Sequence, residues 1–66
     1  SLDAVNGLGW SLLHTKQINK SEKVFKEILE LYPEFIGAFK GLQEIEKIKK
    51  RQALYVQNYI EGVRSV

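Results

Sequence analysis

The side chains that could carry chemistry in this 66-residue chain are few and scattered. His14 is the single histidine, and no carboxylate stands three or four residues after it. Because the chain also has no cysteine, it lacks the ligand set of a zinc site. We predict no metal-binding residue, and we expect His14 to end a helix, where a cation favours the negative end of the dipole.

Catalytic motifs are not indicated either. No nucleophile is paired with a base. Gly7 and Gly9 are spaced like part of a phosphate-binding loop, but they fall within an expected helix and lack the preceding strand and the further glycine of such a loop. We therefore predict no catalytic residue, no cofactor-binding residue and no cofactor, and we expect that the protein is not an enzyme.

The charge is uneven along the chain. Residues 1–34 hold four Lys against five acidic residues, whereas residues 35–66 hold six Lys or Arg against three, and the net charge is +2. The one basic run comprises Lys47, Lys49, Lys50 and Arg51. Such a run is typical of a solvated helix end. The alternative is contact with a nucleic acid or an acidic partner. The positive charge is small compared with the basic faces of nucleic-acid-binding proteins, so we expect no nucleic-acid partner.

The length predicts one small domain with a thin core, because chains of this size rarely gain more than roughly 3–5 kcal/mol from one hydrophobic core. Disulfides are excluded by the absence of cysteine. The apolar runs are only a few residues long, far short of the roughly 20 that span a bilayer. We expect no membrane insertion and a soluble protein, with the cytoplasm slightly favoured.

Hydrophobic spacing predicts helices throughout. Ser1 or Asp3 can cap a helix that runs to about His14, and Val5, Leu8 and Leu12 then share one face. Gly9 lies beside this face, and a helix accepts the roughly 1 kcal/mol cost of an interior glycine where a neighbouring helix comes close. Residues 14–18 read as a turn.

A second helix is predicted over residues 20–32, because Asn19 and Glu22 have the spacing of a capping box. Val24, Phe25 and Ile28 lie on its apolar side. Pro33 ends this helix and suits the first turn of a third. The third helix carries an apolar stripe, which comprises Phe35, Ala38, Phe39, Leu42 and Ile45.

Two interpretations remain open beyond Ile48. Residues 49–51 could form a turn into a further helix over residues 52–63, which would bury Leu54 and Tyr55 in part. Alternatively, Val56, Ile60 and Val63 stay in phase with the third stripe, which indicates one helix of about 30 residues with an unpaired apolar face. We favour the bend, because helices above about 25 residues are uncommon in globular proteins.

The spacing of these residues resembles the tetratricopeptide repeat (TPR), whose period is about 34 residues. The matching positions are Val5, Leu8, Gly9, Leu12, Ser21, Phe25 and Pro33. Val5, Leu12 and Ser21 stand where the family prefers Trp, Tyr and Ala. Lys16 stands where the family often has Gly, which suggests backbone strain or a different turn.

A second repeat begins with Phe39 and Leu42 and then loses the pattern at Gln43, Glu46 and Tyr55. The resemblance implies an all-α fold of three to four helices, in which antiparallel helix-turn-helix hairpins stack as a short α-solenoid. Residues 1–66 would form a single TPR-like domain or fragment. Residues 1–33 are the first repeat, and residues 34–66 are a degenerate second repeat or a capping helix.

The resemblance also implies a function without chemistry, namely a protein-interaction module or scaffold that binds a protein, a peptide, a partner helix or its own copy. The alternative is a purely structural capping segment of a longer helical array. The expected partner-binding residues are Asn6, Trp10, Leu13, Lys40, Glu44 and Lys47. Trp10 could anchor a bound segment or pack beneath a neighbouring helix. Leu54, Tyr55 and Tyr59 are candidates for self-association as a homo-oligomer.

Overall fold

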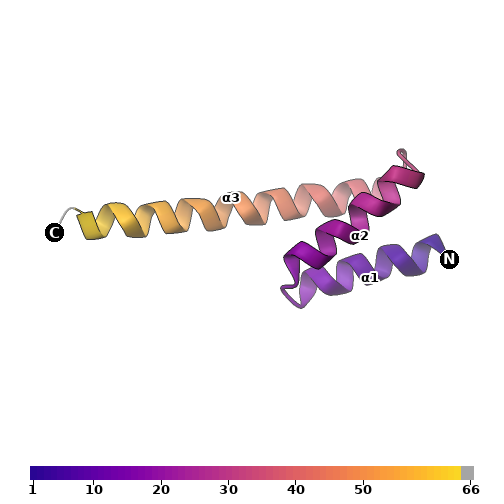
Figure 1. The fold of residues 1–66 in the computed structure, drawn as a ribbon, viewed down its shortest axis with the longest axis horizontal. Coiled ribbons are helices and arrows are strands. Elements are labelled where there is room, and N and C mark those ends of the chain that lie inside the picture. Colours follow the sequence, from indigo (N-terminus) through magenta and orange to yellow (C-terminus); the bar gives the residue numbers. More distant parts are fainter. Residues whose placement is uncertain (65–66) are drawn as a thin grey trace.

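A computed structural model describes residues 1–64, which form three α-helices and no strand. The helices are α1 (Leu2–His14), α2 (Ile18–Leu31) and α3 (Ile36–Arg64). Helices α1 and α2 form an antiparallel hairpin that covers only the first half of α3, so that the second half projects beyond the hairpin (Figure 1). The molecule is therefore elongated, with extents of 54 × 21 × 13 Å. The prediction of an all-α fold is confirmed, with three helices.

Both ends of α1 follow from local hydrogen bonding. The Ser1 hydroxyl accepts from the Ala4 backbone N–H at 3.3 Å and caps the helix. After His14 the chain reverses with Lys16 at φ 64°, in the left-handed region that favours glycine. The Lys16 and Gln17 N–H groups donate to the carbonyls of Leu13 and Leu12, at 3.0 and 2.9 Å. The sequence left open backbone strain or a different turn at Lys16, and the positive φ of Lys16 in this Schellman turn shows the strain.

The predicted start of α2 is wrong. The helix begins at Ile18 with Gln17 at the capping position, and Asn19 lies inside its first turn. The side-chain hydrogen bond in this turn involves Gln17 and not Asn19: the Gln17 side-chain amide donates to the Thr15 hydroxyl at 3.0 Å. At its other end α2 stops as predicted, since Tyr32 adopts an extended φ of −135° before Pro33.

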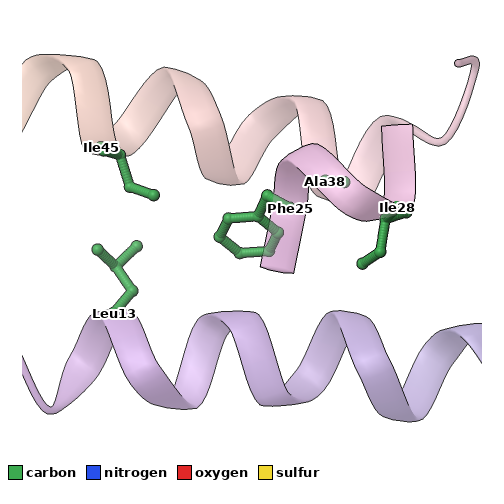
Figure 2. Close-up of a cluster of buried hydrophobic side chains, with 5 residues drawn as sticks. All are labelled: Leu13, Phe25, Ile28, Ala38 and Ile45. Atoms are coloured by element: carbon green, nitrogen blue, oxygen red, sulfur yellow. The ribbon is translucent and has the colours of Figure 1, made fainter. Parts of the chain in front are cut away.

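The core is built around Phe25 of α2, which is fully buried between α1 and α3 (Figure 2). A Cβ atom at Gly9 of α1 would lie 2.6 Å from Phe25 Cε1, and one at Gly41 of α3 would also overlap the ring. The two glycines therefore let both neighbouring backbones approach the two sides of one aromatic ring. The other buried apolar side chains are Leu13, Ile28, Ala38 and Ile45.

A buried hydrogen bond joins α1 to α2 beside this ring. The Ser21 hydroxyl is fully buried and donates to the Gly9 carbonyl at 2.7 Å. The close approach predicted at Gly9 is therefore confirmed, and the small Ser21 side chain adds a specific hydrogen bond there.

The predicted inner faces of α1 and α3 are wrong in part. Val5 and Leu8 are 44% and 53% exposed, and Phe39 is 55% exposed. Helix α2 instead meets the sides of its neighbours that carry glycine, because the Phe25 ring takes the space that Gly9 and Gly41 leave. The buried face of α1 is rotated accordingly, toward Gly9 and Leu13.

The predicted bend at residues 49–51 is also wrong, because α3 continues without interruption from Ile36 to Arg64. Leu54 and Tyr55 are consequently 60% and 76% exposed. The physical reason is local: residues 46–57 contain no glycine, proline, asparagine or aspartate and are rich in good helix formers. No residue in this segment is of a type that ends a helix. The rarity of long helices in globular proteins therefore does not predict a bend here.

Candidate functional site

A groove lies between the end of α1 and the middle of α3, beside the turn of the hairpin. Its volume is about 560 Å³. It is lined by Trp10, Leu13, His14, Lys16, Ile18, Glu44, Ile48 and Gln52. We refer to this hollow as the groove. Its lining is mixed, since four of these residues are apolar and the other four are polar or charged. A pocket that holds a ligand commonly combines apolar walls with polar groups that fix the orientation of the ligand.

Trp10 forms one wall of the groove and is half-buried. Its ring meets Phe25 edge to face, with centroids 5.5 Å apart and planes at 67°. The His14 ring also lies close to Trp10, at a centroid distance of 6.2 Å. Trp10 thus packs against the buried Phe25 ring and also lines the groove. The packing that holds it fixes its orientation for a bound segment.

The charges at the edge of the groove are of both signs. Glu44 is half-buried in its wall and forms no ion pair with any residue of the described chain. Lys16, in the hairpin turn, also lines the groove, and His14 ends α1 as predicted. A carboxylate held without a partner beside apolar walls is a position at which a cationic group of a ligand would be stabilised.

The structure brings together only part of the predicted partner-binding set. Trp10, Leu13 and Glu44 line the groove, with Leu13 buried in its floor. Lys40 and Lys47 are exposed and lie outside it.

Asn6, the remaining member of that set, also lies outside the groove. Its amide lies against Gly37 of α3, where a Cβ atom would be 2.8 Å from Asn6 Nδ2. The Oδ1 atom is buried and accepts no hydrogen bond within residues 1–64. Asn6 therefore belongs to the contact between α1 and α3.

The sequence did not lead us to place Lys16, Ile18, Ile48 or Gln52 at a binding site, although all four line the groove. Ile48 and Gln52 follow Glu44 at successive four-residue steps, so all three share one side of a continuous helix. This signal was present in the sequence. The expected bend after Ile48 concealed it, since it placed Gln52 in a different helix.

The second half of α3 presents an unpaired apolar face. We call residues 52–64 the tail, and its tail face comprises Ala53, Val56, Tyr59, Ile60 and Val63. These side chains are exposed, Val56 by 54%, Ile60 by 44% and Tyr59 by 68%. Tyr55 borders this face, whereas Leu54 points to the opposite side of the helix, two residues from Val56. Gln52 lines both the groove and a shallow hollow along the tail.

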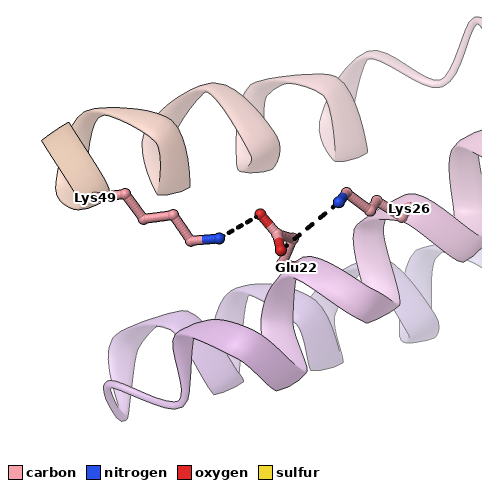
Figure 3. A network of polar contacts seen from close by, with 3 residues as sticks. All are labelled: Glu22, Lys26 and Lys49. Atoms are coloured by element: carbon pink, nitrogen blue, oxygen red, sulfur yellow. Dashed lines mark hydrogen bonds and ion pairs between the residues drawn. The ribbon is translucent and has the colours of Figure 1, made fainter.

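The basic run is partly engaged within the chain. Lys49 donates to Glu22 Oε2 of α2 at 2.8 Å, and Lys26 lies 3.7 Å from Oε1 of the same carboxylate (Figure 3). The hydrogen bond from Lys49 is the main cause that lowers the pKa of the Glu22 carboxyl from its ordinary value of 4.5. Lys50 pairs with Glu46 at 3.2 Å. Two cations of the run thus have carboxylate partners, and Glu22 ties α2 to α3 at the point where the tail begins.

Within residues 1–64, no group of three histidine or acidic side chains could hold a metal ion. No helix in that range has an apolar stretch long enough to cross a membrane. No family model, no curated protein and no solved structure matches the chain.

Proposed function

We propose that this chain is a protein-interaction module that holds a helical or extended protein segment in the groove between α1 and α3. The observation that carries the proposal is the groove itself. It combines a half-buried tryptophan, an apolar floor and the unpaired carboxylate of Glu44. Tryptophan is enriched among the residues that dominate binding energy at interfaces. The TPR resemblance supports the proposal by analogy, since that family binds segments along the first helices of its hairpins.

A displayed library of random 15-residue peptides, panned on the chain immobilised at low density, tests this proposal. Trp10 is the only tryptophan, so its fluorescence reports the groove directly. Selected peptides should shift the Trp10 emission to shorter wavelength, and Glu44→Lys should weaken their binding by about tenfold or more, since it places a cation where a carboxylate stood.

Glu46→Lys is the matched control. Glu46 lies two residues from Glu44 on the same helix and has a side chain that is 67% exposed outside the groove. The same charge change at this position should leave peptide binding nearly unchanged. Panning that enriches no peptide sensitive to Glu44→Lys would refute the groove as a binding site.

A second candidate function rests on a different surface. Val5 and Leu8 form an exposed apolar strip on α1, beside the side that carries the buried Gly9 and Leu13. This strip favours a structural role, in which another hairpin stacks on α1. A tandem chain with a second copy of residues 1–34 placed before Ser1 tests it. Stacking should raise the melting temperature, and Leu8→Glu in the original copy should abolish the gain. An unchanged melting temperature would contradict the structural role.

A further inference from the structure

A short pattern of residues occurs twice in the chain, 34 positions apart. It consists of alanine, an apolar residue, any residue, glycine and leucine, and it covers residues 4–8 in α1 and residues 38–42 in α3. The two helices also begin 34 positions apart, at Leu2 and Ile36. The two copies of the pattern therefore lie at the same distance from the start of their helices and on the same side of each helix.

In α3 this pattern forms the surface on which α2 packs. Ala38 is fully buried, and Leu42 packs against the core. A Cβ atom at Gly41 would overlap the Phe25 ring, so the glycine leaves the space that the ring occupies. We call Ala38, Gly41 and Leu42 the α3 seat, because together they accommodate one aromatic side chain of a neighbouring helix.

In α1 the same pattern is uncovered. Ala4 is exposed, Leu8 is 53% exposed, and a Cβ atom at Gly7 would meet no atom within 4 Å. Ala4 and Gly7 lie roughly 140–160° around the helix axis from the middle of the side that buries Gly9 and Leu13. Helix α1 also lies at the edge of the three-helix array (Figure 1). We call Ala4, Gly7 and Leu8 the α1 seat.

We propose that the α1 seat accommodates an aromatic side chain from a partner helix of the α2 type, as the α3 seat accommodates Phe25. The partner is an amphipathic helix that runs antiparallel to α1 and presents a phenylalanine or tyrosine among aliphatic side chains, as α2 presents Phe25 next to Val24 and Ile28. This inference rests on the structural role proposed above, since it names the helix that stacks on α1 and the contact that fixes its position.

The glycine of the α1 seat supports this partner. Glycine is a poorer helix former than alanine, so a glycine inside a helix is best explained by a close neighbour. A Cβ atom at Gly9, Gly37 or Gly41 would lie less than 3.0 Å from a side chain of a neighbouring helix. Gly7 has no such neighbour within the chain, although it stands in the same pattern as Gly41. An aromatic ring of a partner would supply that neighbour.

The likeness between the two surfaces is confined to the seat. Asp3 and Ser11 stand where α3 has Gly37 and Ile45, so the contacts of those two residues are not repeated on α1. Val5 extends the apolar area beside the seat and is 44% exposed. The surface on α1 is therefore smaller than that on α3, and the aromatic side chain over Gly7 is its central contact.

Gly7→Ala tests the inference in two chains, the 66-residue chain and the tandem chain with residues 1–34 placed before Ser1. In the tandem chain Ser1 follows Glu34 of the added copy as Phe35 follows it in the single chain, which places the added Phe25 over the α1 seat. In the single chain Gly7→Ala should raise the melting temperature by roughly 2–5 °C, since alanine is the better helix former. In the tandem chain it should lower the melting temperature, because the methyl group would overlap the ring.

Gly62→Ala is the matched control. A Cβ atom at Gly62 also meets no atom within 4 Å, but Gly62 lies outside the repeated pattern. This variant should change the melting temperatures of the single and the tandem chain in the same direction. The opposite signs expected for Gly7→Ala would then report the contact with the ring and not helix propensity alone.

The inference and the structural role fail in different ways. A tandem chain that melts above the single chain, and that Gly7→Ala stabilises further, leaves the structural role standing and overturns the aromatic contact. A tandem chain that gains no stability over the single chain overturns both. A single chain that Gly7→Ala destabilises would contradict the open surroundings of Gly7 and overturn the α1 seat as well.

Discussion

The two halves of α3 carry apolar residues in the same phase and yet have opposite surroundings. Over residues 36–48 the helix buries Ala38, Gly41 and Ile45 against the hairpin, whereas every residue from Lys49 to Arg64 is exposed. The backbone is helical in both halves. The comparison separates two causes: local hydrogen bonding and helix propensity suffice to continue a helix, while burial requires another element within reach.

The tail stays helical because its start is already fixed. Nucleating a helix is costly, whereas adding residues to an existing one gains a hydrogen bond each. The anchored first half supplies that start, and the salt bridge between Lys50 and Glu46 bridges the junction at 3.2 Å. Within the tail, the Gln57 amide donates to Glu61 at 3.3 Å. Such pairs contribute a few tenths of a kcal/mol each.

The largest expected effect breaks the packed half. Phe25→Ala should destabilise the chain by about 3–5 kcal/mol, because it removes the one ring that both neighbouring helices enclose. That loss equals the whole stability expected of so small a core, and thermal unfolding followed by circular dichroism should lose its cooperative transition. Tyr59→Ala is the control in the tail. Tyr59 is 68% exposed, and at low micromolar concentration its removal should change stability by less than about 0.5 kcal/mol. Equal losses would contradict the contrast between the halves.

Two glycines of α3 sharpen the comparison directly. A methyl group at Gly41 would overlap the Phe25 ring, whereas one at Gly62 would meet no atom within 4 Å. Gly41→Ala should therefore cost about 1–3 kcal/mol through overpacking. Gly62→Ala should instead stabilise the tail by up to about 1 kcal/mol, since alanine is the better helix former. Urea unfolding of both variants measures the difference, and a shared sign would refute the assigned packing.

The buried hydrogen bond of Ser21 should contribute to the free energy of unfolding of the packed half. Ser21→Ala should cost about 1 kcal/mol, because the hydroxyl no longer donates to the Gly9 carbonyl while the shape of the site is nearly kept. The exposed Ser11 provides the control, and Ser11→Ala should be neutral or slightly stabilising. Chemical denaturation resolves the two, and identical midpoints would show that the bond adds nothing to close packing.

The smallest expected effect lies at the boundary between the halves. Glu22→Gln should cost less than about 1 kcal/mol at pH 7, because the contact with Lys49 is partly solvated. The folded chain lowers the Glu22 pKa below 4.5, so the ion pair stabilises the fold above that pH. The contribution is lost as the pH falls through the lowered pKa of the folded state.

The measurement is the free energy of unfolding of both proteins as a function of pH. The difference between wild type and Glu22→Gln should be present at neutral pH and vanish in acid. Glu46→Gln is the control, since its contact with Lys50 is far more exposed. A difference that persists unchanged at low pH would show that the charge of Glu22 is not the cause.

Much of the hairpin could be predicted from residues alone. The cap, the hairpin turn and the stop before Pro33 are properties of adjacent residues. The stop is confirmed, and the structure chooses Ser1 over Asp3 as the cap and shows the positive φ of Lys16 where strain or a different turn was expected. The close approach at Gly9 was also predicted correctly, because a helix that accepts a glycine usually gains a neighbour there.

The candidate site was predicted less well. Trp10, Leu13 and Glu44 line the groove, while Lys40 and Lys47 do not. Helical spacing assigns residues to a face, but it does not say which face a neighbour covers. In α1 the side that carries Val5 and Leu8 is not the side that is buried. The Phe25 ring packs where Gly9 and Gly41 leave room for it, and not against the largest apolar side chains.

The sequence by itself determined the local structure: an all-α chain, with a strained turn at Lys16 and a helix that nothing after Ile48 interrupts. The tertiary structure decided which surfaces are covered. The position of Phe25 between Gly9 and Gly41 depends on three helices at once, and no short-range pattern encodes it. For the same reason the groove at Trp10 and the open tail face emerge only when the hairpin is seen to cover half of α3.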